Sequence, residues 1–286
     1  MSNLLINNRF FFLDDLLPFI KRYSGSTFVV KYGGSIMEDN SLKFSVIKDI
    51  CFLHSLGINL VIVHGGGVII NYWLNKLNIE PMFKDGVRIT DHETMQVVEM
   101  VLSGKINKDL VSLLNNNNTL SIGLSGKDLN FIQASPLFDS IDNLAGKVDT
   151  ISIDLLNLFL SKKIIPVIAS IACGKDGKTY NINADTVASA VASSLQADKL
   201  ILLTDTLGVL TDINDQSTLV KDLNLSTVKK LQSMKVISGG MIPKIQCCIN
   251  ALKSNVKSTH IIDGRIKNSL LYEVLTSERI GSMIVL

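Results

Sequence analysis

Residues 60–67 read Leu60-Val61-Ile62-Val63-His64-Gly65-Gly66-Gly67 and are followed by the apolar-periodic stretch 68–77. This order predicts a buried strand, a glycine turn and then a helix. Glycines carry no Cβ atom, so the backbone can approach a ligand closely, and the free N–H groups of the first helical turn favour an anion. A second strand-like run, 27–32, ends in Gly33-Gly34. Together the two turns predict that two anionic groups are bound near each other.

Strand-like and helix-like segments alternate along the rest of the chain. The strand-like runs are nearly continuous Val, Ile and Leu, as expected of a sheet covered on both faces. The alternation predicts an α/β fold, a three-layer sandwich with a mostly parallel central sheet. Strands are expected at residues 27–32, 60–64, 120–124, 164–168, 200–204, 259–263 and 282–285, and helices at 42–56, 68–77, 92–105, 108–114, 153–160, 185–195, 227–234, 241–254 and 269–275.

Two regions depart from this alternation. Residues 131–177 mix short runs with turn residues, and Asp176-Gly177 is a hairpin signal, so β-hairpin insertions near a domain seam are expected there. Residues 8–23 are expected to form an amphipathic helix that Pro18 kinks or breaks. Its apolar face has to be buried on its own domain or on another subunit, and the pattern leaves both open.

Composition excludes several classes of protein. Of the 286 residues, 47% are hydrophobic, which indicates a well-packed globular chain. The net charge of +2 and the scattered basic residues do not predict binding to nucleic acid. No run approaches the roughly 20 apolar residues of a membrane helix. With neither a signal sequence nor a transit peptide recognisable, we expect the protein to work in the compartment where it is made.

Neither the cysteines nor the histidines predict a metal site or a catalytic nucleophile. The four cysteines have no zinc-binding spacing and are expected to be reduced thiols. The four histidines form neither a metal spacing nor a triad, and His64 is expected to be structural, holding the glycine turn. Walker A and dinucleotide-binding sequences are also missing.

Candidate functional residues follow strands or begin helices. Lys31 lies at a strand end beside Gly33-Gly34, where a lysine can neutralise phosphate oxygens; the alternative is a solvated strand-end lysine. Another helix begins with Asn181, Asn183 and Asp185. One of these residues could simply be the N-cap, but three polar groups exceed what capping requires.

Three further segments carry candidates. The polar cluster at 203–208 follows a strand, as expected of a nucleotide pocket. Residues 238–244 repeat the glycine turn before a helix, with Pro243 allowed in the first turn and Lys244 as a second candidate phosphate lysine. Arg88 lies in a loop before a helix, where it could clamp a carboxylate with two hydrogen bonds or form a surface salt bridge.

Taken together, these blocks resemble the amino-acid kinase family and, within it, the acetylglutamate kinase branch. The resemblance covers nearly the whole chain, and its specific part is Gly86-Val87-Arg88-Ile89-Thr90 and Asn181-Ile182-Asn183-Ala184-Asp185. It implies the amino-acid kinase fold, with residues 26–180 as a lobe that binds N-acetylglutamate and 181–286 as a lobe that binds ATP. The other matching blocks are 28–35, 61–67, 84–90, 202–205, 239–244 and 261–265.

The resemblance implies that ATP phosphorylates the side-chain carboxylate of N-acetyl-L-glutamate in arginine biosynthesis. Mg²⁺ is expected to be held mainly by ATP, so no protein ligand for metal is named. The acceptor carboxylate is already ionised near pH 7, so positioning and charge neutralisation are expected to replace a general base. By resemblance, Lys31 and Lys244 stabilise the transferring phosphoryl group and Asp185 holds these lysines. The implied substrate contacts are Gly66, Gly67, Arg88 and Asn181, and the implied nucleotide contacts are Gly33, Gly34, Thr204, Asp205, Gly208 and Ser238.

Regulation and assembly are also implied by the resemblance. In arginine-inhibited members a kinked N-terminal helix links dimers into a hexamer, and residues 1–25 resemble that helix. Phe19, Glu273 and Gly281 are the implied arginine contacts, although such enzymes often carry tyrosine at the position of Phe19. Cyanobacterial and plastid members bind the PII signalling protein. The composition suggests a low-GC coding bias, which favours a plastid stroma or a bacterial cytoplasm.

Two rival functions remain at this stage. One is another kinase of the same family, such as a glutamate 5-kinase or a carbamate kinase. The other is a non-catalytic amino-acid sensor built on a kinase fold, which the presence of both Lys31 and Lys244 disfavours.

Overall fold

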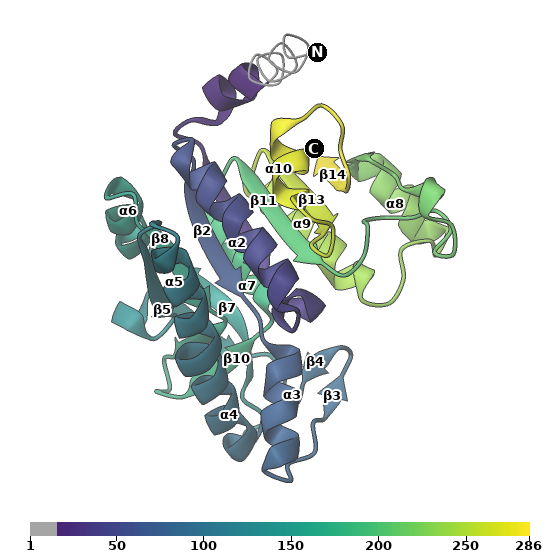
Figure 1. Ribbon diagram of the computed structural model, residues 1–286. Helices are drawn as coiled ribbons and strands as arrows, with labels where there is room; N and C mark the ends of the chain where they lie inside the picture. The colour runs from purple at the N-terminus through teal and green to yellow at the C-terminus, as the bar shows by residue number, and fades with distance from the viewer. Residues whose placement is uncertain (1–15) are drawn as a thin grey trace.

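The computed structural model describes residues 16–286. At its centre lies an eight-stranded sheet in the order β12-β14-β13-β11-β1-β2-β8-β5 (Figure 1). Every neighbouring pair is parallel except β13 and β14, so the predicted mostly parallel sheet is confirmed. The strands are β1 Thr27–Tyr32, β2 Asn59–His64, β5 Ser121–Ser125, β8 Ile165–Ala169, β11 Lys199–Thr204, β12 Asp222–Asn224, β13 Ser258–Asp263 and β14 Ser282–Val285.

Helices cover the sheet, with α2 in front of it and α7 behind it in the view of Figure 1. The middle strands are buried along almost their whole length, as their unbroken Val, Ile and Leu runs require. Helix α7 packs against β1, β2 and α9, and α10 packs against α2. Helices on the sheet include α2 Asn40–Ser55, α6 Asp154–Ser161, α7 Ala184–Ser194, α9 Met241–Lys253 and α10 Ser269–Leu275. Helix α8 (Leu225–Ser233) packs on the edge strand β12, and α3 (Gly67–Lys76) packs on the helical segment 92–106.

The helix expected to end at residue 105 does not end there. Helix α4 (His92–Glu99), the π-helical segment η2 (Met100–Ile106) and α5 (Asn107–Asn116) follow one another without interruption. The predicted break before residue 108 is therefore wrong. The Asn107 N–H donates to the Leu102 carbonyl oxygen, five residues back, so the backbone stays hydrogen-bonded past Gly104.

Four strands between residues 132 and 182 form a small closed barrel beside the central sheet, in the order β10-β7-β6-β9. The hairpin predicted at Asp176-Gly177 is confirmed, since β9 and β10 pair antiparallel across it. Closure of the barrel was not predicted, because it depends on the parallel pairings of β6 with β9 and of β10 with β7. The strands are β6 Ile132–Pro136, β7 Ala145–Ile151, β9 Ile171–Gly174 and β10 Thr179–Ile182.

The N-terminal helix is described only from residue 16. Residues 16–23 are helical, so Pro18 does not break this part; the predicted stretch 8–15 lies outside the described residues. Phe19 and Tyr23 pack against the core of the same chain, and the Tyr23 and Phe28 rings meet edge-on at 5.4 Å. For this part of the helix, Leu16 is buried and Phe19, Ile20 and Tyr23 are half-buried on its own domain, while Leu17 is 47% exposed. Between residues 16 and 286, no helix is long and apolar enough to span a membrane.

Candidate active site

The predicted phosphate-binding residues gather where parallel strands end. Asp185, at the start of α7, lies between two lysines: its Oδ1 is 3.0 Å from Lys31 Nζ, and its Oδ2 is 2.7 Å from Lys244 Nζ. Lys31 stands near the end of β1, and Lys244 in the first turn of α9. The side chains are only 9–18% exposed, so water screens these charges poorly.

The electrostatics of this group keep the carboxylate ionised. Burial alone would raise the pKa of Asp185, but the positive charges of Lys31 and Lys244 outweigh it and lower that pKa to about 2. Its Oδ1 contacts Lys31 Nζ, and its Oδ2 accepts a hydrogen bond from Lys244 Nζ. The group therefore holds two cations around one anion and has a net positive charge available for phosphate oxygens.

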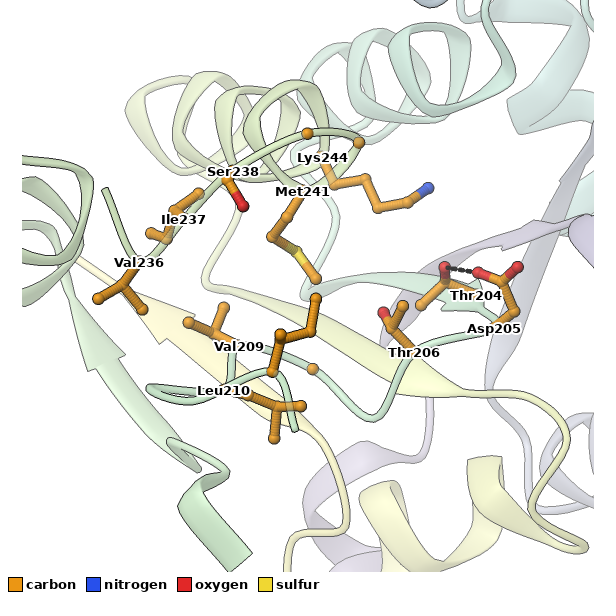
Figure 2. A pocket seen from close by; sticks show the side chains of 14 residues that line it. Thr204, Asp205, Thr206, Val209, Leu210, Val236, Ile237, Ser238, Met241 and Lys244 are labelled. Carbon is orange, nitrogen blue, oxygen red and sulfur yellow. Dashed lines mark hydrogen bonds between the residues drawn. The ribbon is translucent and has the colours of Figure 1, made fainter. Parts of the chain in front are cut away.

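A cavity of about 310 Å³ opens beside Lys244. Figure 2 shows a polar end, where Lys244 points toward Thr204 and Asp205, and an apolar end formed by aliphatic side chains. The hydroxyl of Thr204 donates to Asp205 Oδ1 over 3.2 Å. This polarity suits a ligand with a charged part and a flat apolar part. The apolar end is made by Val209, Leu210, Val236, Ile237 and Met241.

Most of the nucleotide contacts implied by the sequence line this cavity. Thr204, Asp205, Gly208 and Ser238 do so together with Lys244. Gly33 and Gly34 do not line it and lie instead at the end of β1, where Gly33 is close to Lys31 Nζ. Val209, Leu210 and Met241 also line the cavity but were not predicted from the sequence. The sequence feature that could have indicated them is the presence of apolar residues in or beside loops.

A second cavity, of about 160 Å³, is lined by Ile182, Asn183 and Ala184, the residues just before Asp185. The implied substrate contacts Gly66, Gly67, Arg88 and Asn181 all line it. Ala184, the residue before Asp185, lines it as well, so the charged group adjoins both cavities. Phe83 and Leu102 close its apolar sides and were not singled out in the sequence.

Arg88 is held over this cavity by a hairpin rather than by the expected loop. Strands β3 (Phe83–Lys84) and β4 (Val87–Arg88) pair across Asp85-Gly86, which both have positive φ, the geometry of a two-residue hairpin turn. A prediction of a loop was therefore wrong. The Asp-Gly dipeptide could have indicated the hairpin, but its strands have only two residues each.

The guanidinium of Arg88 is only partly satisfied. Its Nη2 donates to Asn71 Oδ1 over 2.6 Å and to the Gly67 carbonyl oxygen over 3.3 Å. Its Nη1 is buried and has no hydrogen-bond partner among the described residues. Burial lowers the pKa of Arg88 from its ordinary value, yet an arginine keeps its charge in proteins. A buried cationic donor without an anion favours a ligand carboxylate.

Strand β10 and helix α7 connect the second cavity to the group formed by Lys31, Asp185 and Lys244. Asn181 Nδ2 donates to Thr90 Oγ1 over 3.1 Å, and this hydroxyl donates to the Arg88 carbonyl oxygen. Asn183 caps α7, since its side chain accepts from the N–H groups of Asp185 and Thr186. Asn181 and Asp185 therefore lie at the two ends of one five-residue segment. Asn181 lines the second cavity, and Asp185 contacts the two lysines.

The residues implied in arginine binding lie near the amino ends of the central strands, away from Lys31 and Thr204. Phe19 and Glu273 line a cavity of about 680 Å³ where β1, β11 and β13 begin. Gly281 does not line it, but its N–H donates to Glu273 Oε2 over 3.2 Å. Two further residues of this cavity, Lys199 and His260, were not predicted.

Lys199 and His260 form a buried polar chain with Glu273. Lys199 Nζ lies 3.1 Å from His260 Nε2, and His260 Nδ1 lies 2.7 Å from Glu273 Oε1. Burial lowers the pKa of Lys199 to about 8 and that of His260 to about 4. A lysine at the start of a fully buried strand was the available signal. Among residues 16–286, no three His, Cys, Asp or Glu side chains cluster in a way that could hold a metal ion.

Residues 26–263 match the sequence pattern of the amino acid kinase family. The chain belongs to the amino acid kinase family. It is 56% identical to an acetylglutamate kinase of the red alga Gracilaria tenuistipitata var. liui, over 99% of this chain and 100% of that protein. It is 50% identical to an acetylglutamate kinase of the cyanobacterium Prochlorococcus marinus, over 95% and 96% of the two chains.

Solved structures give the same family context. N-acetylglutamate synthase from Neisseria gonorrhoeae, complexed with coenzyme A and N-acetyl-glutamate, superimposes with a TM-score of 0.84 at 26% identity, over 96% of this chain and 62% of that one. The same synthase complexed with coenzyme A and L-arginine gives 0.79 at 26% identity, over 95% and 64%. The predicted amino acid kinase fold is confirmed. The full-length similarity to kinases of this family also shows an enzyme, a phosphotransferase, and so disfavours the non-catalytic sensor.

Proposed function

We propose that this enzyme transfers the γ-phosphoryl group of ATP to the side-chain carboxylate of N-acetyl-L-glutamate, in arginine biosynthesis. The observation that carries the proposal is the unpartnered Nη1 of Arg88, buried in a cavity next to a lysine pair. The cavity is small enough for an amino-acid derivative and is lined by the Asn181 amide. The algal and cyanobacterial relatives are named for this activity.

On the acceptor side, Arg88 would bind the α-carboxylate of N-acetylglutamate and Asn181 would contact it. The planar guanidinium of an arginine can donate two parallel hydrogen bonds to a carboxylate, which the ammonium group of a lysine cannot do. Its orientation is set by the bonds to Asn71 and Gly67, which leave Nη1 free for the substrate. The other carboxylate of the substrate would then face the lysine pair.

On the transfer side, Lys31 and Lys244 would neutralise the charge that spreads over the phosphoryl oxygens in the transition state, and Asp185 would hold both amines. The acceptor carboxylate is a nucleophile without deprotonation. His64, the histidine nearest to the turn, is fully buried, and burial lowers its pKa to about 4, so it is not suited to act as a base. Positioning and electrostatics would supply the catalysis.

On the nucleotide side, the apolar end of the first cavity fits a purine base and the end at Lys244 fits the phosphates (Figure 2). We propose Mg²⁺ as part of the ATP substrate, bound through its phosphates. Residues 26–180 would form the acceptor lobe and 181–286 the ATP lobe. Asn181, Asn183 and Ala184 also line the acceptor cavity, from the first residues of the second lobe.

The proposal is tested by measuring ADP release with a panel of acceptors. We expect turnover with N-acetyl-L-glutamate, and a kcat/KM roughly 100-fold or more above those for L-glutamate and carbamate, because a buried polar site discriminates strongly against analogues that mispair with it. Hydroxylamine should trap the acyl phosphate as a hydroxamate. Faster turnover with glutamate or carbamate would assign the enzyme to another branch of the family.

We also propose feedback inhibition by arginine at the cavity lined by Phe19 and Glu273. The cavity offers Lys199 for a carboxylate and carboxylates for a guanidinium. It opens at the beginnings of β1 and β11, and the far ends of these strands carry Lys31 and Thr204. A displacement of these strands caused by ligand binding at their amino ends could be transmitted to the residues at their carboxyl ends. The gonococcal synthase was solved with L-arginine. Phe19 supplies no hydroxyl, so only apolar contact is available from that side chain.

Arginine should lower the ADP-release rate, and removal of residues 1–24 should abolish this inhibition and reduce the assembly from a hexamer to a dimer. The reason is that the N-terminal helix would form both a wall of the cavity and the link between dimers. Inhibition is measured by titration, and mass by light scattering. A truncated protein with unchanged mass and unchanged inhibition would contradict the proposal.

Location and the PII partner are proposals of the same kind. The relatives come from a red alga and a cyanobacterium, which is compatible with a plastid stroma or a bacterial cytoplasm. Relief of arginine inhibition on addition of a PII protein would support that partnership, and an unchanged inhibition curve would count against it.

A further inference from the structure

Asn107 is a buried polar residue at the point where η2 passes into α5, and it is 1% exposed. Its Nδ2 lies 2.8 Å from the Val167 carbonyl oxygen of β8, 3.4 Å from the Leu124 carbonyl oxygen of β5 and 3.2 Å from His64 Nε2 of β2. These three strands are neighbours in the sheet, in the order β2-β8-β5. One side-chain amide therefore contacts all three strands.

His64 extends this connection to the glycine turn. Its Nδ1 lies 3.0 Å from the Gly65 carbonyl oxygen. A carbonyl oxygen can only accept, so Nδ1 carries the proton and Nε2 is left to accept from Asn107. Burial lowers the pKa of His64 to about 4, in agreement with a neutral ring. The orientation of the amide is supported separately, because Lys108 Nζ, a donor, lies 3.3 Å from Asn107 Oδ1.

Two glycines make room for this arrangement. A Cβ atom on Gly123, within β5, would lie 1.8 Å from Asn107 Oδ1, so a larger residue would displace the amide. A Cβ atom on Gly66 would lie 2.4 Å from Ile106 Cδ1 and 2.7 Å from Leu102 Cδ2, both side chains of η2. The π-helical segment therefore packs directly on the turn that lines the acceptor cavity.

We propose that Asn107 is a positioning residue for the acceptor side of the reaction. By donating to Nε2 it fixes the Nδ1–H tautomer of His64, and His64 in turn holds the Gly65 carbonyl at the start of the turn. The extra residue of the π turn rotates the following helix α5 by about 100°. This rotation sets the direction in which the side chain of Asn107 points. The inference rests on the proposed function, since Gly65 lines the cavity assigned to N-acetylglutamate.

The tautomer is measured on the full-length wild-type protein with ¹⁵N-labelled histidine. Nitrogen chemical shifts in NMR spectra distinguish the Nδ1–H form, the Nε2–H form and the imidazolium, and the variant His64→Gln identifies the signals of His64 by their loss. We expect the neutral Nδ1–H form at pH 7. An Nε2–H ring or an imidazolium in the wild type would overturn the proposal without the need for any variant of Asn107.

Asn107→Asp preserves the size of the side chain but replaces the donor with an acceptor. We expect Nε2 of His64 to gain a proton and kcat/KM for N-acetylglutamate to fall roughly 10- to 100-fold, the scale of a small misplacement of reacting groups. The KM for ATP should stay unchanged, because the nucleotide cavity shares no residue with the turn. Asn116→Asp, in an exposed residue of the same helix, is the matched control and should alter neither quantity.

The outcomes separate this inference from the proposed function. A wild-type protein that releases no ADP with N-acetylglutamate overturns the function, while the tautomer is still measurable. A folded Asn107→Asp protein with wild-type kinetics for N-acetylglutamate overturns the positioning role. If this variant does not fold, Asn107→Ser takes its place, because serine is too short to reach His64, and the same fall in kcat/KM is expected.

Discussion

Replacing either Lys31 or Lys244 with alanine should lower turnover roughly 100- to 1000-fold, the scale on which one preorganised donor to a transition state contributes. The two amines are held 3.0 and 2.7 Å from the oxygens of one buried carboxylate, so neither can move to replace the other. Each variant also leaves Asp185 with one cation in place of two, which reduces the positive charge offered to the phosphoryl group. Steady-state ADP release with saturating ATP and N-acetylglutamate measures the effect.

The matched control for these variants is Lys253→Ala. Lys253 lies on α9 like Lys244, but it is exposed and far along the helix from the cavities. The Lys253→Ala variant should have wild-type kinetics. Near-normal turnover of the Lys31 or the Lys244 variant, with circular dichroism showing a folded protein, would refute the assignment of that lysine.

Arg88→Ala should raise the KM for N-acetylglutamate by at least about 30-fold, because truncating one partner of a buried charged hydrogen-bonded pair costs about 2–5 kcal/mol. Arg88→Lys should rescue little, since an ammonium group is not bidentate. The KM for ATP should change much less. Arg88 lines the acceptor cavity and not the nucleotide cavity.

Lys84→Ala provides the comparison for Arg88. Lys84 is an exposed cation on the same hairpin. Its removal therefore shows how the charge of the hairpin affects the KM for N-acetylglutamate while Arg88 is still present. Binding of N-acetylglutamate is measured by calorimetry as well as by kinetics, to separate affinity from turnover. An unchanged affinity in Arg88→Ala would mean that the α-carboxylate is bound elsewhere.

The parts of the fold that could be predicted are those with a strong local pattern. The runs at β1 and β2 are apolar, buried on both faces and followed by glycine turns, so both the strands and their ends are evident in the sequence. Lys31, Asp185 and Lys244 were found because each lies beside such an end or helix start. Their meeting within 3.0 Å depends on the parallel order of the strands, which no local pattern contains.

The parts that could not be predicted depend on contacts between distant segments. The π turn has no distinct composition, and two of its side chains, Leu102 and Ile106, pack on Gly66, which is distant in sequence. The barrel closes through parallel pairings of strands that are far apart in sequence. Similarly, Lys199 becomes notable only once the fold brings His260 beside it.

The segment from β10 into α7 has a consequence for how the two reactants meet. Asn181 lines the cavity proposed for the acceptor, and Asp185 contacts both lysines. The segment from Asn181 to Asp185 has only five residues, and the Asn183 cap makes it rigid. In the proposed reaction, this short covalent segment would therefore set the distance between the acceptor and the amines of Lys31 and Lys244. If residues 181–286 bind ATP as proposed, a movement of their outer part would admit or release nucleotide without changing this spacing. The enzyme would then tolerate wide variation in how far it opens, but very little in the length of that short segment.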